Sequence, residues 1–244
     1  MLYDAGEGLR AYLAASPLAW LFATIGAYVL GVRLYERCGR VQIVNPILVA
    51  VVVLSGVLWL AGIDYANYFA GAQFVHFLLG PVTVLLAVPL YRSVALIRRS
   101  ARSVLISLLS GSLLASITAM LVAGWLGADD ALVRSLAAKS VTTPIALGIT
   151  EALGGITSIT AVIVVFTGVI GGIMAGWVFR FGRVSDPSAM GFALGLTSHG
   201  IGIGRAVQID TRAAAFATLG VCLNGVFTAL WVPAVVPWLL RQLG

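Results

Sequence analysis

The sequence predicts an all-α membrane protein with about seven transmembrane helices and one re-entrant or broken-helix element. Of its 244 residues, 60% are hydrophobic and only 10% are charged, whereas a soluble domain carries about 25% charged residues. This number of polar groups is too small to cover a water-exposed surface. A soluble protein with a very large core is therefore the poorer alternative to a membrane protein. No long linker separates the apolar runs, and we therefore expect a single integral membrane domain over residues 1–244.

Seven charge-free runs predict the spanning helices, because crossing the hydrocarbon core takes about 20 residues of helix. The runs are residues 11–32, 41–63, 65–91, 103–128, 152–179, 187–204 and 213–240. The run at 187–204 is marginal in length. The first run follows Asp4 and Glu7 rather than a basic segment, so we read it as a spanning helix and not as a signal peptide.

The distribution of charge predicts the orientation and excludes a nucleic-acid partner. Arginines gather in the connections at 33–40, 92–102 and 180–183, whereas most acidic residues fall in the alternate connections. The positive-inside rule then places the N-terminus outside and the C-terminus in the cytoplasm of a multi-pass protein in the inner or plasma membrane. The net charge of +6 reflects this arrangement in the lipid bilayer and not an affinity for nucleic acid.

Two stretches interrupt the regular pattern. FLLGPVTVLLAVPLYR, residues 77–92, contains Gly80, Pro81 and Pro89, and proline breaks a helix because it removes a backbone donor. KSVTTPIALGITEALGG, residues 139–155, contains an apolar run half a membrane thick between two charges. We expect it to be a re-entrant segment or a short helix dipping in from outside. Broken backbone at membrane depth is tolerated only where protein or a water-filled cavity covers it.

A third irregular stretch, TSHGIGIGR, predicts one wall of a binding site. Its glycines allow unwound backbone with accessible amides, and a guanidinium beside such amides suits a carboxylate. His199 could donate to that ligand or carry a coupling proton; alternatively, it is a neutral histidine bonded to a neighbouring helix. Arg205 could instead mark the helix end and extend to the interface. The candidate site residues are Ser198, His199, Gly200, Gly202, Gly204 and Arg205.

SVTTP, at residues 140–144, predicts the other wall. Ser140, Thr142 and Thr143 precede Pro144, a pattern typical of a helix start, where hydroxyls cap exposed N–H groups. A helix N-terminus buried in the membrane also attracts an anion, and Lys139 could add positive charge. We therefore count all four residues as substrate-binding candidates.

Glu151 and Asn224 are the remaining candidates. Glu151 is either a surface carboxylate or a second proton-coupling candidate. Asn224 lies within the last apolar run and needs a partner, so we expect it to hydrogen-bond between helices, and we also count it as a substrate contact. The sequence shows neither a histidine–acid set with metal-ligand spacing nor a catalytic nucleophile motif. We expect no metal, no cofactor and no enzymatic activity.

Two short stretches resemble each other. NPILVA at 45–50 and TPIALG at 143–148 both place a polar residue before Pro-Ile. Inverted repeats are common in transporters, but six residues leave open whether this chain contains one.

Four motifs in order resemble the LrgB/CidB family, across roughly residues 40–237. They are FLLGPVTVLLAVPLY, SVTTPIALGITEALGGITSITA, TSHGIGIGRA and LNGVFTAL. The chain departs from the family pattern in two places. Gln208 lies near a position that is often acidic, and Ile203-Gly204 replaces the usual small or hydroxyl residue. Both differences bear on substrate choice rather than on the fold.

The resemblance implies two classes of function. Members of the family are described as holin-like or antiholin-like modulators of murein hydrolase activity and autolysis, acting with small LrgA/CidA-type membrane proteins. Plant relatives are plastid glycolate/glycerate translocators, and some bacterial relatives are linked to the transport of pyruvate or other small acids.

Our leading hypothesis is a secondary transporter of small monocarboxylates such as glycolate, glycerate, lactate or pyruvate, coupled to protons. The anion would bind between the two walls. By analogy with other broken-helix carriers, we expect a homodimer. The alternative is an antiholin-like interaction protein with an LrgA/CidA-type partner, although a pore gives no reason for helix breaks beside hydroxyls, a histidine and an arginine.

Overall fold

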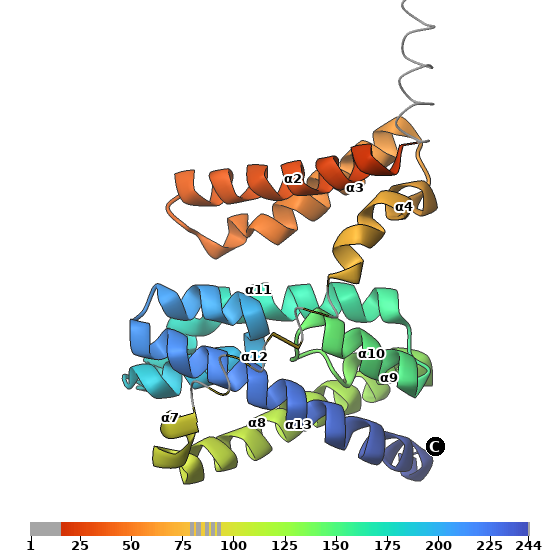
Figure 1. The fold of residues 1–244 in the computed structure, drawn as a ribbon. Coiled ribbons are helices and arrows are strands. Elements are labelled where there is room, and N and C mark those ends of the chain that lie inside the picture. Colours follow the sequence, from red (N-terminus) through yellow and green to blue (C-terminus); the bar gives the residue numbers. More distant parts are fainter. Residues whose placement is uncertain are drawn as a thin grey trace, which may run out of the picture. The chain divides into compact units, whose positions relative to one another are not determined.

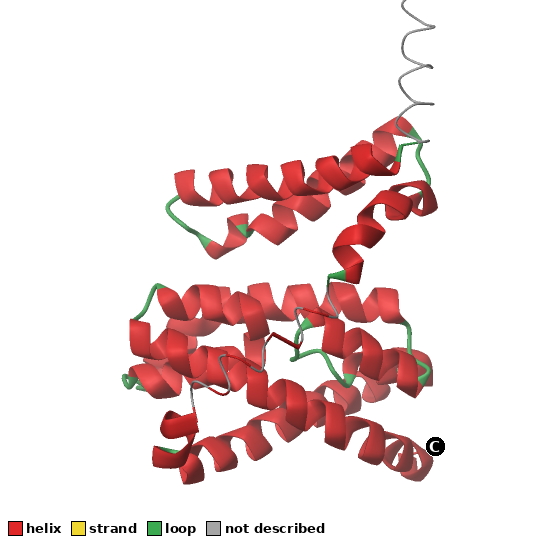
Figure 2. Ribbon diagram, viewed as in Figure 1, coloured by secondary structure: helices red, strands yellow, loops and turns green. Residues whose placement is uncertain are grey.

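The computed structural model describes residues 16–78, 81, 84, 85, 88, 91 and 94–243, and these contain helices and no strand (Figures 1 and 2). The chain divides into two compact units, residues 1–82 and 83–244. The expectation of one membrane domain over 1–244 stays a prediction. Gly80 and Pro89 lie outside the described residues, so the predicted break at 77–92 is untested, although Pro81 is helical and exposed.

Unit 1 consists of α2 (Pro17–Arg37), a short 3-10 helix (Gln42–Val44), α3 (Pro46–Ala61) and α4 (Tyr65–Phe77). Helix α2 packs against both α3 and α4. The contacts are made at glycines: a Cβ at Gly31 would lie 2.6 Å from the Pro46 carbonyl oxygen, and one at Gly71 would collide with Pro17. Small residues at such positions let helices approach closely in lipid.

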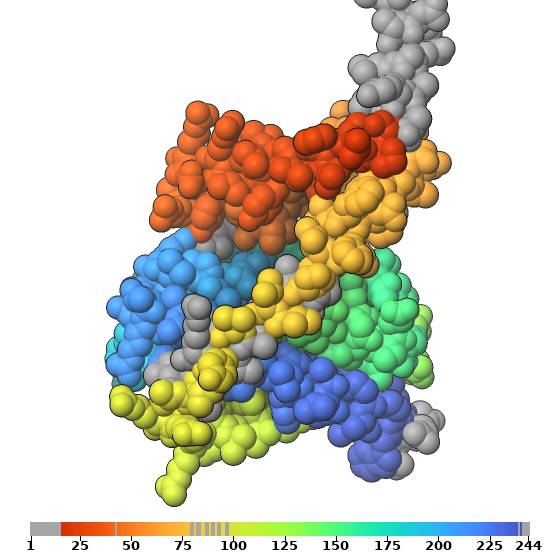
Figure 3. All heavy atoms as spheres, viewed as in Figure 1, coloured from red at the N-terminus to blue at the C-terminus, as the bar shows by residue number. Residues whose placement is uncertain are grey.

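Unit 2 holds the candidate site and contains seven described helices. They are α7 (Val94–Arg99), α8 (Ala101–Trp125), α9 (Asp130–Leu136), α10 (Thr143–Leu153), α11 (Thr157–Phe181), α12 (Pro187–Val207) and α13 (Thr211–Leu243). Helix α12 packs most extensively against α13 and also contacts α8 and α11. Helices α8 and α13 cross (Figure 1) and lie next to each other on the face shown in Figure 3, in yellow-green and dark blue.

Helix α12 reverses its direction at His199, the one residue within it whose backbone is not helical. Leu194 and Gly202 would lie about 12 Å apart along a straight helix, yet a Cβ at Gly202 would collide with the Leu194 carbonyl oxygen. Helix α12 is therefore a hairpin with arms at 187–198 and 200–207. The first arm begins, and the second arm finishes, at the same end of unit 2.

Helix α13 starts at that end too and runs parallel to the first arm of α12. A Cβ at Gly191 or Gly195 would collide with the carbonyl oxygen of Ala213 or Ala217, respectively. This end of unit 2 holds the starts of α8, α12 and α13 and the end of α11. We call it the arginine end. Its described arginines are Arg98, Arg99, Arg102, Arg180, Arg183, Arg205 and Arg212.

Helices α9 and α10 form a second hairpin, which enters from the opposite end. Arg134 Nη1 donates to the Leu153 carbonyl oxygen (3.2 Å), and the Ile156 N–H donates to Ser135 Oγ (2.7 Å), so α9 lies beside the end of α10. The tip of this hairpin is residues 137–142. Helix α10 has 11 residues and is about 16 Å long, which agrees with the short helix predicted at 139–155.

Four described helices are long and apolar enough to cross a membrane: Pro17–Arg37, Ala101–Trp125, Thr157–Phe181 and Thr211–Trp238. The all-α, multi-pass membrane class is supported, but the count of seven crossings is not confirmed. The run at 187–204 was predicted to span, and that prediction is wrong because the chain turns back at His199. Hydropathy alone cannot distinguish a crossing from a reversal.

The two similar stretches, NPILVA and TPIALG, both begin a helix with proline in its first turn. In α3 the Asn45 side chain accepts from the Ile47 N–H (2.9 Å), and in α10 Thr142 occupies the N-cap position before Pro144. The shared helix start agrees with the sequence similarity. The inverted repeat itself stays a prediction.

Candidate functional site

The reversal in α12 lies at a histidine and not at a glycine. His199 has φ 42° and ψ −133°, a conformation that side chains with a Cβ rarely adopt. Gly200, Gly202 and Gly204 were predicted to unwind, but all three are helical. Of these, Gly202 is required for the close approach of the two arms, whereas Gly200 and Gly204 are exposed.

Helix α11 supplies both the space and the hydrogen bond that hold the reversal. A Cβ at Gly168 would lie 2.7 Å from His199 Cε1, and one at Gly171 would collide with Ser198 Oγ. His199 is buried, and its Nε2–H donates to the Val164 carbonyl oxygen (2.9 Å). His199 therefore does bond to a neighbouring helix, and its role as a carrier of a coupling proton stays a prediction.

Asn224 on α13 joins the tips of the two hairpins. Its Nδ2 group donates to the carbonyl oxygen of Ser140 (3.2 Å) in the α9–α10 tip and to that of Leu196 (3.0 Å) just before the α12 reversal. Its Oδ1 accepts from Thr228 Oγ1 (3.1 Å). The predicted hydrogen bonding between helices is confirmed. SVTTP and TSHGIGIGR, far apart in sequence, are brought together as predicted.

A cleft of about 450 Å³ lies between these tips and is open on the side of Phe166 and Ile170, which are both about half exposed. We call it the inner cavity. Its polar lining combines both predicted walls, with Ser140 and Lys139 from one and Thr197 and Ser198 from the other. Thr167 of α11 adds a further hydroxyl, and the rest of the lining is Ala115, Ile163, Phe166, Ile170 and Gly171. Ser140 is only 5% exposed, and its Oγ has no hydrogen-bond partner among the described residues. A buried hydroxyl without a partner costs free energy, so a ligand or water there would stabilise the site.

Lys139 gives the inner cavity a positive charge. It is the one lysine in the sequence, and it lies in the turn between α9 and α10, outside the helices that could span a membrane. Burial lowers the pKa of its ammonium group. Because the described lining contains no acidic side chain, the cavity combines one cation, several hydroxyls and an apolar wall. That combination suits a small carboxylate.

Several predicted residues lie away from the inner cavity. Arg205 is carried toward the arginine end by the second arm of α12, where its Nη1 donates to Gln208 Oε1 (2.7 Å). Glu151 is exposed near the end of α10. Thr143 and Pro144 form the first turn of α10, and the Thr142 hydroxyl before them is buried without a partner among the described residues.

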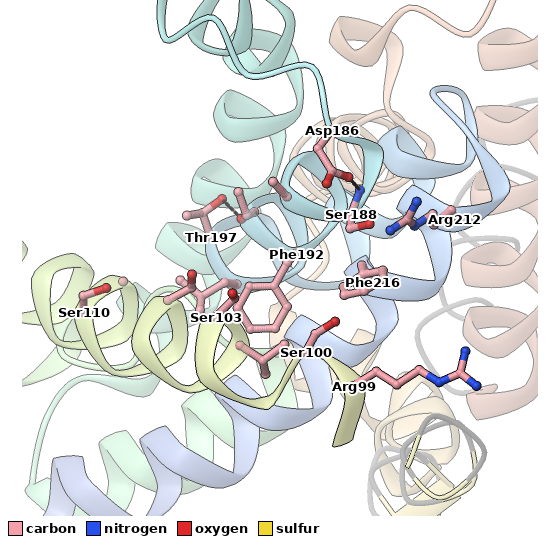
Figure 4. Close-up of a pocket in the computed structure, with 16 residues that line it drawn as sticks. Arg99, Ser100, Ser103, Ser110, Asp186, Ser188, Phe192, Thr197, Arg212 and Phe216 are labelled. Carbon is pink, nitrogen blue, oxygen red and sulfur yellow. Dashed lines mark hydrogen bonds between the residues drawn. The ribbon is translucent and has the colours of Figure 1, made fainter. Parts of the chain in front are cut away.

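A second cavity, of about 600 Å³, was missed by sequence reasoning (Figure 4). We call it the serine cavity, because Ser103, Ser107 and Ser110 of α8 line it at helical spacing. Its other polar lining residues are Arg99, Ser100, Asp186, Ser188, Thr197 and Arg212. The signal in the sequence was the spacing of serines along one face of an otherwise apolar run.

Comparison with known proteins identifies the family. The pattern of the LrgB-like family matches residues 24–238, which is most of the chain. The chain belongs to the LrgB family. This confirms the resemblance carried by the four motifs.

Curated relatives of this LrgB-family chain match it over almost their whole length. The protein named "Uncharacterized protein YwbG" of Bacillus subtilis (strain 168) is 32% identical over 219 residues, or 90% of this chain and 97% of the relative. "Antiholin-like protein LrgB" of the same strain is 29% identical over 221 residues (91% and 96%). Its counterpart in Bacillus cereus (strain B4264) is 30% identical over 224 residues (92% and 97%). No solved structure matches.

The names of these LrgB relatives agree with the antiholin-like alternative and do not mention transport. The geometry of unit 2 bears on a different question, which is what the chain can bind. No group of histidine, cysteine, aspartate or glutamate side chains suited to a metal ion occurs in the part of the chain that the structure describes.

Proposed function

We propose that this LrgB-family chain is a secondary transporter of small monocarboxylates, such as glycolate, glycerate, lactate or pyruvate. The observation that carries the proposal is the inner cavity, where two helix hairpins entering from opposite ends meet and place Lys139 beside the unpartnered hydroxyl of Ser140. Transporters commonly bind their substrate between such discontinuous helices. The volume of about 450 Å³ falls within the range of small-molecule sites.

The lining matches the chemistry of a short hydroxy- or ketoacid. The Lys139 ammonium would bind the carboxylate through charge-assisted hydrogen bonds. Ser140 and Ser198 would bond a hydroxyl or keto oxygen, and the apolar wall would cover the short carbon chain. His199 remains the candidate for a coupling proton because it directly follows Ser198, whereas Glu151 is exposed. The expected homodimer belongs to the same proposal.

Uptake of labelled small acids into proteoliposomes under a pH gradient tests the proposal. We expect saturable uptake by the wild type and a loss of about tenfold or more in kcat/KM for Lys139→Gln, because a charge-assisted hydrogen bond contributes roughly 1.5–3 kcal/mol. Arg205→Gln is the matched control, since it removes a positive charge outside the cavity. The absence of saturable uptake for every acid tested would contradict the proposal, as would equal losses in the two variants.

A second candidate is the antiholin-like modulator of murein hydrolase activity, acting with an LrgA/CidA-type membrane protein. The names of the relatives favour it more than they favour transport. Co-purification with such a partner and measurement of autolysis in cells test it. Ser140→Ala separates the two functions: a pure interaction protein keeps its effect on autolysis in this variant, whereas a transporter loses uptake.

A further inference from the structure

The serine cavity presents hydroxyls where a membrane-spanning helix would ordinarily present apolar side chains to lipid. Ser103, Ser107 and Ser110 are all exposed on α8, which is one of the helices able to cross a membrane. A serine can satisfy itself within a helix, and Ser110 Oγ donates to the Ile106 carbonyl oxygen of its own helix (2.7 Å). The spacing of the serines alone therefore does not define a site.

Ser188, in the first turn of α12, supplies an independent observation. It lines the serine cavity, is only 8% exposed, and its Oγ has no hydrogen-bond partner among the described residues. Its N–H donates to Asp186 Oδ1 (2.7 Å), so Asp186 already serves as the helix cap. Ser188 therefore adds a buried hydroxyl without a described partner to the lining at this end of the cavity.

The charges at the arginine end of the cavity favour an anion. Arg99 and Arg212 line it together with a single acidic residue, Asp186. Figure 4 shows Asp186, Ser188 and Arg212 toward one end of the cavity and Thr197 and Ser110 toward the other. A cleft lined by an excess of one charge raises the local concentration of the opposite charge.

Thr197 lines both this cavity and the inner cavity. Its Oγ1 lies 3.3 Å from Ser198 Oγ, which lines the inner cavity. Polar side chains thus line both cavities, with Arg99 and Arg212 in the serine cavity, Thr197 in both, and Ser198 and Ser140 in the inner cavity.

We propose that the serine cavity is the water-filled entrance through which a small anion passes from the arginine end to the inner cavity. This inference rests on the proposed transport function. Arg99 and Arg212 attract the anion, the serines of α8 and Ser188 replace its hydration water, and Thr197 lies where the entrance meets the binding site.

Thiol accessibility tests the entrance in the full chain. The variant Ser107→Cys is made in a background with Cys38→Ser and Cys222→Ala, and its matched control is Ile106→Cys. Ile106 is adjacent on α8, at the same depth, and 66% exposed, so in the membrane we expect it to face lipid. Both variants are placed in lipid nanodiscs and treated with anionic sulfonatoethyl or cationic trimethylammonium-ethyl methanethiosulfonate.

We expect Ser107→Cys to react with the anionic reagent about tenfold or more faster than Ile106→Cys, and faster than with the cationic reagent. Adding Arg212→Gln should reduce the preference for the anion. Complete modification of Ser107→Cys in proteoliposomes should block uptake. Equal reaction rates at positions 106 and 107 would overturn the proposal, as would full uptake after complete modification.

The two proposals fail in different ways. If the wild type transports no acid, the transport function is wrong, and the reactivity of Ser107→Cys alone then decides whether a wet, anion-selective entrance exists. If the wild type transports but Ser107→Cys is as unreactive as Ile106→Cys, the entrance is wrong and the transport function stands.

Discussion

Residue 199 carries an imidazole where the backbone would be better suited by glycine. Its φ of 42° lies in a region that glycine populates readily and other residues do not. The hydrogen bond from Nε2 to the Val164 carbonyl oxygen (2.9 Å) and the space left by Gly168 hold the side chain in place. The ring therefore stabilises a reversal that its own Cβ opposes.

Two substitutions separate these opposing effects. His199→Gly and His199→Ala both remove the imidazole hydrogen bond, but only glycine accepts the backbone conformation without strain. We expect the glycine variant to be the more stable by roughly 1–2 kcal/mol, the reverse of the order in an ordinary helix. Thermal unfolding in detergent, followed by tryptophan fluorescence, measures the difference. A more stable alanine variant would show that the backbone at 199 is ordinary helix.

Lys139 predicts a pH dependence of substrate binding. Its pKa is lowered from the ordinary value of 10.5 by burial. The ammonium is charged below this lowered pKa and neutral above it, so the affinity for a carboxylate should fall as the pH rises through it, before pH 10.5 is reached. Substrate KM measured from pH 6 to 10 checks this. Lys139→Arg keeps its charge throughout and should give a flat profile; a wild-type profile as flat as this one would contradict the prediction.

The charged residue of the site was only partly predictable from sequence. Arg205 was the preferred cation because it ends the glycine run, and Lys139 was considered only as an addition. The reversal at His199 carries Arg205 away from the inner cavity, whereas the tip at 137–142 brings Lys139 to it. Neither the position of Arg205 nor that of Lys139 could be predicted from the local amino-acid composition.

At the scale of elements, the α12 hairpin depends on one of three similar glycines. A Cβ at Gly202 would collide with the Leu194 carbonyl oxygen, whereas one at Gly200 or Gly204 would meet nothing within 4 Å. We expect Gly202→Ala to destabilise unit 2 by about 1–3 kcal/mol and to abolish uptake.

Gly200→Ala and Gly204→Ala are the matched controls. Alanine is about 1 kcal/mol more favourable than glycine in a helix, so both variants should be as stable as the wild type or slightly more so. Thermal unfolding and uptake are measured on all three proteins. Equal behaviour of the three would mean that the arms of α12 do not pack as described.

The sequence located the irregular elements more reliably than it described them. The glycines at 200–204 and the proline at 144 marked both hairpin tips to within a few residues, because glycine and proline weaken helices wherever they occur. The direction of the chain beyond each tip depends on packing against α11 and α13. A run such as 187–204 is apolar in either case.

At the scale of the whole molecule, the reversal changes the expected orientation. The arginine end of unit 2 carries seven described arginines with Asp186 and Asp210, whereas the opposite end carries Asp129, Asp130 and Glu151 with Arg134 and Arg241. The positive-inside rule places the arginine end in the cytoplasm. Because α13 starts there, we predict that the C-terminus lies outside, although counting seven crossings placed it inside.

Reporter fusions in a Gram-negative host test the orientation. Alkaline phosphatase fused after the C-terminal residue should be active, because this enzyme matures only outside the cytoplasm, and a fluorescent reporter that matures only inside should be dark. Fusions after Arg183, at the arginine end, are the control and should give the opposite pattern. A fluorescent C-terminal fusion would instead support the orientation predicted from seven crossings, with the C-terminus in the cytoplasm.

The three hydrogen bonds of Asn224 limit how this protein can move. One amide nitrogen holds both hairpin tips, at 3.2 Å and 3.0 Å, so the tips cannot part without leaving buried carbonyl groups unsatisfied. The two hairpin tips are therefore expected to move together with α13 as one rigid unit. If the chain is the transporter proposed above, access to the two faces of the membrane would alternate by movement of this whole unit, and not by separation of the two tips.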